Sequence, residues 1–363
     1  MSEMKLGLGL YRHMLKDEYF AFARQCGCTH LIVHLADYYS KQIVTATDEN
    51  NNYGNSLALE KIWEEDSMNA LQKKASEYGL TIYGIENFSP ADWYDVLLDG
   101  PTRDKQMEQL KKIIRNTGKA GIKAFGYNFS LAGVWGHQKK NIARGGALAT
   151  CFDASEINLK ARIPKGEIWN MTYAKGDGTF QNPVTSQELW DRLERFLKEI
   201  LPVAEEAGVE LALHPDDPPY EGMRQMPRLV YQPELYQKVI NIKDSPSNKL
   251  EFCMGSIQEM MHGDIYQAIE RYGSQNKISY VHFRNVKGKV PKYKEVFVDD
   301  GDIDMFRALA MLDKYNFNGV LIPDHTPELT CDVPWHAGMA YALGYMKGAL
   351  QMLNRGYLND FIK

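Results

Sequence analysis

Four residues whose side chains can bind a transition metal follow short apolar runs in the second half of the chain: His214, Cys253, His282 and Asp324. Their separations are near 40, 30 and 40 residues, each about one strand–helix unit. Taken singly, a buried histidine or cysteine is more often packed than liganded. Together, two imidazoles, a thiolate and a carboxylate suit Mn²⁺, Fe²⁺, Co²⁺ or Zn²⁺. A structural zinc more often uses cysteines at close CxxC spacing, which this chain lacks. The set therefore favours a catalytic metal.

The elements that carry these residues alternate between short apolar runs and longer amphipathic stretches, which is typical of strand–helix units. Eight runs are predicted strands: Leu6–Leu10, Leu31–His34, Leu80–Glu86, Ile122–Tyr127, Val209–His214, Leu250–Cys253, Ile278–Phe283 and Val320–Asp324. The predicted helices are Leu57–Tyr78, Arg103–Ala120, Ser186–Ala207, Ile257–Tyr272, Met305–Tyr315 and Ala337–Leu353. Eight such units predict an α/β fold, a (β/α)8 TIM barrel. Active sites of these barrels lie at the carboxyl ends of the strands, where the four residues would meet.

Two connections are too long to be simple turns, namely Ala36–Ser56 and Ser130–Thr185. Loops of this length in a compact domain are usually functional or disordered. Both leave the carboxyl ends of predicted strands, so we expect them to cover the site. For the second connection, an oligomer contact arm is nearly as strong an alternative. No repeat or linker indicates a second domain, so residues 1–363 are expected to form one domain.

Composition excludes some classes of partner. The net charge is −5 and both signs are interspersed, so the chain has no electrostatic footprint for nucleic acid or an anionic membrane. The five cysteines are odd in number and show no CxxC spacing. The N-terminus lacks the features of a secretory signal, and no apolar run is long enough to span a bilayer. These features predict a cytoplasmic protein.

Residues beside the four candidate ligands could act on a substrate. Arg284 follows His282 by two residues, so on a strand the two side chains would point to the same side of the sheet. Arg284 could then bind a substrate carboxylate through two hydrogen bonds. An ordinary salt bridge within the protein is equally expected. His325, beside Asp324, is a candidate general acid or base. Two further polar residues stand at the ends of predicted strands, Glu86 and Asn128. They could bind substrate hydroxyls or fill the upper barrel.

Two acidic residues follow His214 directly, Asp216 and Asp217. They could orient the His214 ring or cap the next element. We slightly favour orientation, because histidines that bind metals usually donate their other N–H to a partner.

Several longer segments resemble signatures of the D-mannonate dehydratase family of xylose-isomerase-like barrels: HPDDPP at 214–219, DSPSNKLEFCMGS at 244–256, VHFRNVK at 281–287, DGDIDM at 300–305 and PDH at 323–325. The resemblance implies dehydration of D-mannonate to 2-keto-3-deoxy-D-gluconate, a step of hexuronate catabolism, with Mn²⁺ or Fe²⁺. It implies that the four residues above bind the metal. It also places His325 at the acid/base histidine, and Arg284 and Asn285 in the substrate-contacting strand.

Three segments depart from the family pattern. Pro334–Trp335–His336 stands where the family has a catalytic tyrosine, so His336 either takes that role or the role is lost. Lys294–Asp300 lacks a histidine, and Ser130–Gln138 replaces an Asp-Trp-Thr-Arg-Thr motif. These changes would cluster around the substrate. A metal-dependent isomerase or epimerase of another sugar is therefore the alternative to a dehydratase.

A third hypothesis is a metal- or sugar-binding protein without turnover. Retention of His325 and Arg284 beside the metal set counts against it. The expected partners are a small sugar acid and further copies of the chain, because barrels of this kind commonly associate.

Overall fold

The computed structural model describes residues 3–38 and 61–362. Most of the predicted connection Ala36–Ser56 lies outside the described residues, as does the start of the predicted helix Leu57–Tyr78. Among the described residues, no helix is both long enough and apolar enough to cross a membrane.

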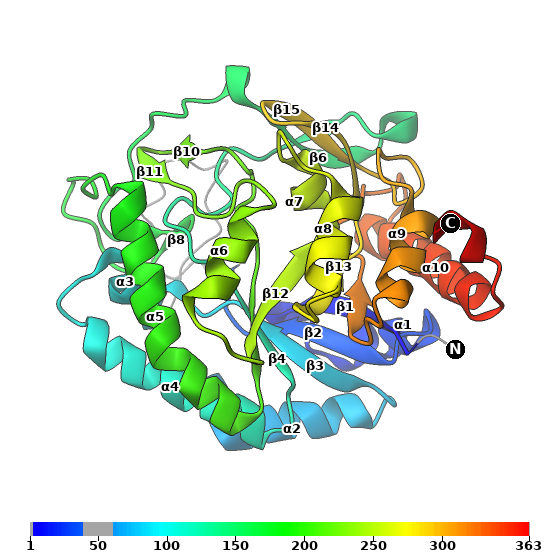
Figure 1. The fold of residues 1–363 in the computed structure, drawn as a ribbon, viewed down its shortest axis with the longest axis horizontal. Coiled ribbons are helices and arrows are strands. Elements are labelled where there is room, and N and C mark those ends of the chain that lie inside the picture. Colours follow the sequence, from blue (N-terminus) through cyan, green and yellow to red (C-terminus); the bar gives the residue numbers. More distant parts are fainter. Residues whose placement is uncertain (1–2, 39–60, 363) are drawn as a thin grey trace.

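Eight parallel strands close into a barrel, in the spatial order β1-β16-β13-β12-β9-β4-β3-β2 (Figure 1). Their bounds are β1 Lys5–Tyr11, β2 His30–His34, β3 Thr81–Glu86, β4 Ala124–Tyr127, β9 Glu210–Leu213, β12 Asn248–Cys253, β13 Ile278–His282 and β16 Val320–Ile322. Each coincides with one of the eight predicted strands, so the predicted barrel is confirmed. Short apolar runs form these strands because helices cover the outside of the barrel while side chains fill its inside.

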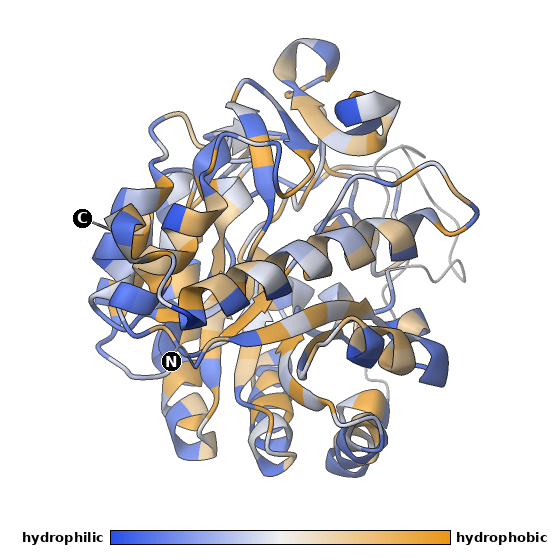
Figure 2. Ribbon diagram, turned by 90° about the vertical axis from the view of Figure 1, so that its right-hand side faces the viewer, coloured by the Kyte–Doolittle hydropathy of each residue, from blue (hydrophilic) through white to orange (hydrophobic). Residues whose placement is uncertain are grey.

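Helices follow the strands around the outside: α1 Asp17–Gln25, α2 Glu65–Ser76, α3 Pro90–Leu98, α4 Arg103–Lys119, α5 Ser186–Ala207, α6 Leu235–Ile242, α7 Met254–Glu259, α8 Ile265–Gly273, α9 Met305–Lys314 and α10 Pro334–Asn354. In Figure 2 the central strands are mostly hydrophobic, and hydrophilic residues mark the helices. Local signals explain the ends of α5. Thr185 and Glu188 form a capping box at its start, and Gly208 ends it at a positive φ of 68°.

The single helix predicted over Ile257–Tyr272 is wrong, because the chain forms α7 and then α8 with a break between them. Asp264 accepts hydrogen bonds from the backbone N–H groups of Tyr266 and Gln267 and so caps a new helix. The periodicity continues across the break, which is why the sequence pattern did not reveal it.

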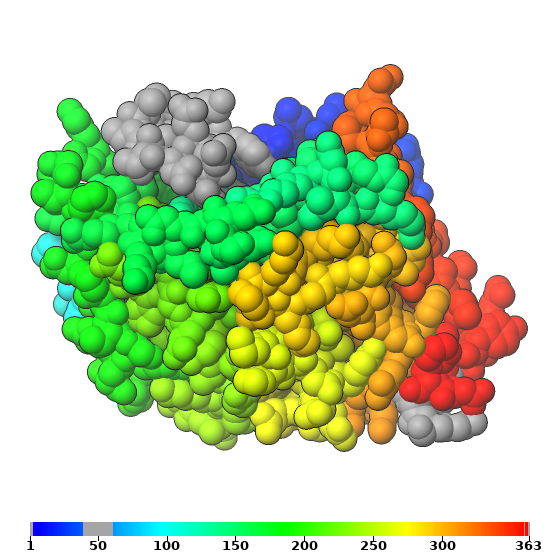
Figure 3. All heavy atoms as spheres, turned by 90° about the horizontal axis from the view of Figure 1, so that it is seen from above, coloured from blue at the N-terminus to red at the C-terminus, as the bar shows by residue number. Residues whose placement is uncertain are grey.

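The connections that leave β4, β9 and β13 carry additional antiparallel strands. Four of them form one sheet in the order β14-β15-β6-β5, with bounds β14 Asn285–Lys289, β15 Lys292–Val296, β6 Leu148–Asp153 and β5 Gln138–Asn141. Two small hairpins join β7 Glu167–Ile168 to β8 Met171–Thr172, and β10 Gly222–Met223 to β11 Met226–Pro227. Figure 1 shows the four-stranded sheet and β10–β11 at the top. From above, residues near 150 and near 290 lie side by side, where β6 pairs with β15 (Figure 3).

Candidate active site

A cavity of about 90 Å³ opens at the carboxyl ends of the barrel strands. Its lining residues stand at or just after the ends of β1, β2, β3, β4, β9, β13 and β16. Three others, Val134, His137 and Trp169, come from the connection Ser130–Thr185. Part of that connection therefore borders the mouth of the barrel.

Three of the four predicted metal ligands come together at the carboxyl ends of β9, β12 and β13. His214, Cys253 and His282 each offer a ligand atom, and these atoms lie within 4.8 Å of one another. His214 is held by its own loop, because its Nδ1 lies 2.6 Å from the carbonyl oxygen of Pro215. If Nδ1 carries the hydrogen, Nε2 is left as the ligand atom.

The donor atoms of this group suit a divalent cation. Burial by itself would raise the pKa of Cys253, but the positive charge of Arg284 and hydrogen bonds from His214 and His282 hold it well below the usual value. These contacts therefore favour the thiolate, which is the form that binds metals. Two imidazoles and a thiolate make a donor set suited to a borderline transition metal.

The fourth predicted ligand, Asp324, lies beside this group. Its Oδ2 is 3.2 Å from Nδ1 of His282 and 3.2 Å from Nε of Arg284. Asp324 also has a positive φ of 59°, an unusual backbone conformation for a residue with a side chain. Such strain is concentrated at functional sites. Asp324 lines the cavity together with two of the clustered ligands, His214 and His282.

Arg284 does not point its guanidinium at the cavity. Nη1 lies 2.7 Å from Oε1 of Glu259, Nη2 lies 2.5 Å from Oδ2 of Asp217, and Nε faces Asp324. The residue is only 3% exposed. The predicted clamp on a substrate carboxylate does not fit this placement, whereas the alternative of a salt bridge does. The strand β13 ends at His282, so the alternation of faces assumed in that prediction stops there.

Asn285 also has a structural role in place of the predicted substrate contact. Its amide donates to the carbonyl oxygens of Val298 and Ile303, and its side-chain oxygen accepts from the N–H groups of Val286 and Ile303. It begins β14 and is 1% exposed. All its hydrogen-bonding capacity therefore serves the loop that follows.

His336 lies on the outside of the barrel, in the first turn of α10. Its ring stacks on Tyr19 at 5.3 Å and meets Phe22 edge-on at 4.9 Å, both on α1. It is not among the described residues that line the cavity. The acid/base role predicted for His336 therefore does not fit its position.

His325 does line the cavity. Its Nδ1 lies 3.0 Å from Oε1 of Glu295, and its Nε2 lies 3.5 Å from Oδ1 of Asp324. Burial lowers the pKa of His325, but the two carboxylates outweigh that effect and raise it to about 9. The two carboxylates thus favour the imidazolium, a form that can donate a proton.

The two predicted hydroxyl-binding residues, Glu86 and Asn128, both line the cavity. The Oδ1 atom of Asn128 is buried and has no hydrogen-bond partner among the described residues. An amide oxygen in this position can accept a hydrogen bond from a ligand.

Two cavity histidines were given no role by the sequence analysis. His34, at the end of β2, stacks on Tyr11 at 4.6 Å, and its Nε2 lies 3.7 Å from Oε2 of Glu86. His137 places Nε2 at 2.8 Å from the Tyr293 hydroxyl. The position of His34 at the end of a predicted strand could have identified it as a residue of the site. His137 sits in a long connection, where no local pattern predicted its direction.

The two aspartates after His214 do not orient its ring, as predicted, but contact other residues. Asp216 accepts the N–H groups of Leu229 and Val230 and pairs with Arg228 at 3.1 Å. Asp217 pairs with Arg284 and accepts the Tyr293 hydroxyl at 3.0 Å. The carbonyl oxygen of Pro215, and neither aspartate, is the acceptor for Nδ1 of His214. The two carboxylates instead hold the surrounding loops together.

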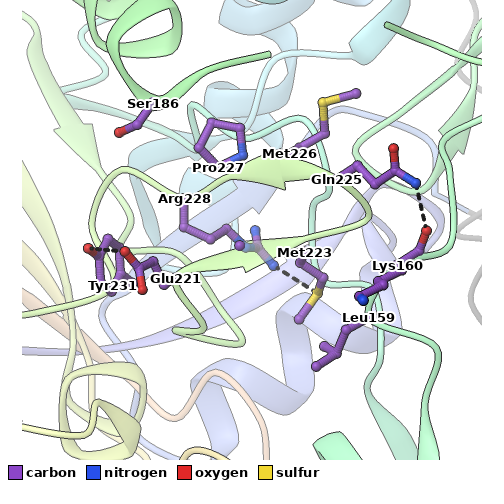
Figure 4. Close-up of a pocket in the computed structure, with 11 residues that line it drawn as sticks. Leu159, Lys160, Ser186, Glu221, Met223, Gln225, Met226, Pro227, Arg228 and Tyr231 are labelled. Carbon is purple, nitrogen blue, oxygen red and sulfur yellow. Dashed lines mark hydrogen bonds between the residues drawn. The ribbon is translucent and has the colours of Figure 1, made fainter. Parts of the chain in front are cut away.

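A second cavity, of about 450 Å³, lies beside the β10–β11 hairpin (Figure 4). Its walls are held by contacts between its own residues, such as the Gln225 amide bound to the Lys160 carbonyl oxygen. The guanidinium of Arg228 reaches Ser130 and Asp216. No predicted site residue is among the described residues that line this cavity.

The chain is similar to several known proteins. A family model described as D-mannonate dehydratase (UxuA) matches residues 40–359. The mannonate dehydratase of Streptococcus suis strain 05ZYH33 is 32% identical over 274 residues, which cover 72% of this chain and 74% of that protein. The crystal structure of mannonate dehydratase from Streptococcus suis serotype 2 superimposes with a TM-score of 0.75 at 27% identity, covering 98% of this chain and 95% of the other.

A more distant match shows the fold alone. A xylose isomerase domain protein from Planctomyces limnophilus is 12% identical, with a TM-score of 0.57, and covers 97% of this chain and 99% of the other.

Proposed function

The chain belongs to the D-mannonate dehydratase family, and we propose that it removes water from D-mannonate, or a close aldonate, with the help of Mn²⁺ or Fe²⁺. The product would be 2-keto-3-deoxy-D-gluconate or its counterpart, formed in hexuronate catabolism. The observation that carries the proposal is the cluster of His214, Cys253 and His282, with Asp324 and His325 lining the cavity beside it. A cytoplasmic location and a homo-oligomeric state remain predictions.

His214, Cys253 and His282, with Asp324 beside them, would hold the metal ion. When bound, such an ion supplies Lewis acidity toward the carboxylate and α-hydroxyl of an aldonate, which makes the C2 proton easier to remove. The buried thiolate and the fixed His214 ring keep the donor atoms in place before substrate arrives. That preorganisation lowers the cost of reaching the transition state.

His325 is suited to the acid step. As an imidazolium it can donate its proton to the C3 hydroxyl, which leaves as water. The proton from C2 requires a neutral base in the same cavity. Burial lowers the pKa of His34, against the opposing charges of Glu86 and Asp324, so its ring is neutral at pH 7. We assign the base to His34, in place of the excluded His336.

The atoms balance with these two residues. His34 takes the C2 proton, a C2–C3 double bond forms, and the C3–O bond breaks as His325 protonates the leaving oxygen. The resulting enol then gains a proton at C3 and loses its hydroxyl proton to become the 2-keto-3-deoxy acid.

The test is turnover by metal-depleted protein reloaded with Mn²⁺ and incubated with D-mannonate and a panel of other hexonates. Formation of a 2-keto-3-deoxy acid at enzymic rates, lost in Cys253→Ala, supports the proposal. Stoichiometric metal binding without any such product from the panel would overturn it.

A metal-dependent sugar isomerase or epimerase is the second candidate. One observation favours it: no lysine or arginine is among the described residues that line the cavity. A neutral sugar needs no positively charged side chain to bind it. The carboxylate of a sugar acid would have to be bound by the metal ion instead. Conversion of neutral ketoses or aldoses, with no 2-keto-3-deoxy acid from hexonates, would select this candidate.

A further inference from the structure

His137 lines the cavity, but the proposed reaction gives it no role. Its side chain is 9% exposed, so the ring is almost enclosed by its neighbours. Nε2 lies 2.8 Å from the Tyr293 hydroxyl and 3.1 Å from Oδ1 of Asp217. One of the two ring nitrogens therefore holds His137 in place.

The groups around Nε2 of His137 determine where its hydrogen lies. The Tyr293 hydroxyl donates its own hydrogen to Oδ1 of Asp217, at 3.0 Å. The other oxygen of Asp217 lies 2.5 Å from Nη2 of Arg284. Nε2 thus faces a carboxylate oxygen and a hydroxyl oxygen whose hydrogen is already used. Both are acceptors, so Nε2 carries a hydrogen and donates it.

The added sheet fixes His137 beside Tyr293 from outside the barrel. His137 directly precedes β5, whose Gln138 pairs with Cys151 on β6. Tyr293 on β15 pairs with the next residue of β6, Phe152, and the two rings stack at 5.6 Å. Backbone pairing through three strands therefore sets the position of the His137 ring relative to its partner.

The residue before His137 also has a specific conformation. Gly136 has a φ of 97°, which residues with a side chain rarely adopt. A Cβ at this position would stand 2.8 Å from Cδ1 of Ile157. A larger residue would therefore shift the turn that brings His137 to the cavity.

The second ring nitrogen, Nδ1, makes no hydrogen bond to any of the residues that the structure describes. Because His137 lines the cavity, a bound ligand can supply the missing partner. A sugar hydroxyl both donates and accepts hydrogen bonds, so it can pair with Nδ1 whether or not that nitrogen carries a hydrogen.

The barrel order indicates which part of a substrate needs such a partner. The four candidate metal ligands stand at or just after the ends of four neighbouring strands, β9, β12, β13 and β16. In the proposed reaction the metal end takes the carboxylate and the C2 hydroxyl, and His325 reaches the C3 oxygen. The hydroxyls at C4, C5 and C6 need other partners. His137 enters from the connection after β4, the strand that follows β9 in the barrel.

We propose that Nδ1 of His137 hydrogen-bonds one hydroxyl of the open-chain substrate beyond C3, and that this contact makes the site select substrates that carry this hydroxyl. The inference rests on the proposed function, which places the carboxylate, C2 and C3 at the metal and His325. A site built to bond a hydroxyl discriminates against an analogue without it, because its own polar atom is then left unpaired.

Two substitutions separate the roles of the two ring nitrogens. His137→Gln can place an amide where Nε2 stands and keep the contacts to Asp217 and Tyr293, but it offers nothing at Nδ1. His137→Asn can place an amide near Nδ1 and loses the other contacts. We expect D-mannonate binding to weaken about tenfold in His137→Gln and less than about threefold in His137→Asn. A purely structural role would give the reverse order.

Deoxy analogues identify the partner hydroxyl. One of 4-deoxy-, 5-deoxy- and 6-deoxy-D-mannonate should bind the unaltered ring about tenfold more weakly than D-mannonate does. The same analogue should bind His137→Gln no more weakly than it binds the unaltered ring, because the two changes remove the same contact.

Isothermal titration calorimetry of the Mn²⁺-loaded full chain gives these affinities. A His34→Gln background keeps the ligand from being consumed. His30→Gln makes the matched substitution at the start of β2, at the opposite end of the barrel, and should change no affinity.

Two results would overturn the inference. One is an unchanged affinity for D-mannonate in His137→Gln. The other is an equal loss in that variant for D-mannonate and all of the deoxy analogues, which would mean that His137 acts only through the shape of the site.

If His137→Gln does not fold, ¹⁵N NMR of the unaltered chain loaded with diamagnetic Zn²⁺ decides. The Nδ1 resonance of His137 should move when D-mannonate binds and stay in place with one deoxy analogue, and a resonance that never moves would overturn the inference. Neither readout depends on turnover. A chain that shows the expected coupling but makes no 2-keto-3-deoxy acid would therefore overturn only the proposed function.

Discussion

Nδ1 of His325 lies 3.0 Å from Oε1 of Glu295, a residue that β15 brings from the added sheet to the mouth of the barrel. The carboxylate is buried and, together with Asp324, raises the pKa of His325 to about 9. The protonated state of the candidate acid therefore depends on a strand that is not part of the barrel.

Replacement of this carboxylate should shift the pH dependence of catalysis. His325 is needed in its protonated form, which is lost as the pH rises through its pKa. In Glu295→Gln the pKa falls, so the basic limb of the kcat/KM profile should move to lower pH by roughly one unit. Glu328→Gln, which removes an exposed partner of Lys139, is the control. An unmoved limb in Glu295→Gln would refute the role given to this pair.

His34→Gln should abolish most proton abstraction. Loss of a positioned base typically costs about 10²- to 10⁴-fold in rate. The base must be neutral, so activity of the unaltered enzyme should fall as the pH drops through the pKa of His34, which burial holds below 6.5. We expect the acidic limb to disappear in the residual activity of the variant. Release of deuterium to solvent from substrate labelled at C2, measured by NMR, checks the same step directly, and undiminished release would exclude His34.

His325→Ala and His336→Ala form a contrasting pair. The first should lower kcat by about 10²- to 10⁴-fold, since it removes the candidate acid. The second should leave kcat within about twofold and cost about 1 kcal/mol of stability, because its ring packs between α1 and α10. Steady-state kinetics and urea denaturation distinguish the two effects. A large loss of kcat in His336→Ala would restore the role predicted from its place in the sequence.

Asp217→Asn should destabilise the fold. Its carboxylate is buried against Arg284, and removing one partner of a buried pair costs about 3 to 5 kcal/mol. Burial would raise the pKa of Asp217, but the charges of His137 and Arg284 hold it well below the usual value. The pair therefore adds stability above the unfolded pKa near ~3.9, and this contribution is lost as the pH falls further. Urea unfolding at neutral pH and near pH 3 gives the free energy of unfolding of the unaltered protein and of Asp217→Asn. The difference between these two free energies should be smaller near pH 3. A difference that does not change with pH would contradict this assignment.

The sequence by itself determined the barrel and the residues at the ends of its strands. Apolar runs, alternating faces and caps such as Thr185 and Gly208 are local properties, so they can be recognised without a partner segment. His214, Cys253 and His282 were predicted to meet for that reason, and their ligand atoms do cluster. Whether they bind a metal stays a prediction.

Only the tertiary structure decided which partners the charged side chains take. Arg284 satisfies carboxylates on three other elements, Asn285 holds its own loop, and His336 packs against α1. His137 enters the site from a long connection with no distinctive local pattern. A side chain's partners depend on segments that are distant in the sequence, and the periodicity of its own strand or helix carries no information about them.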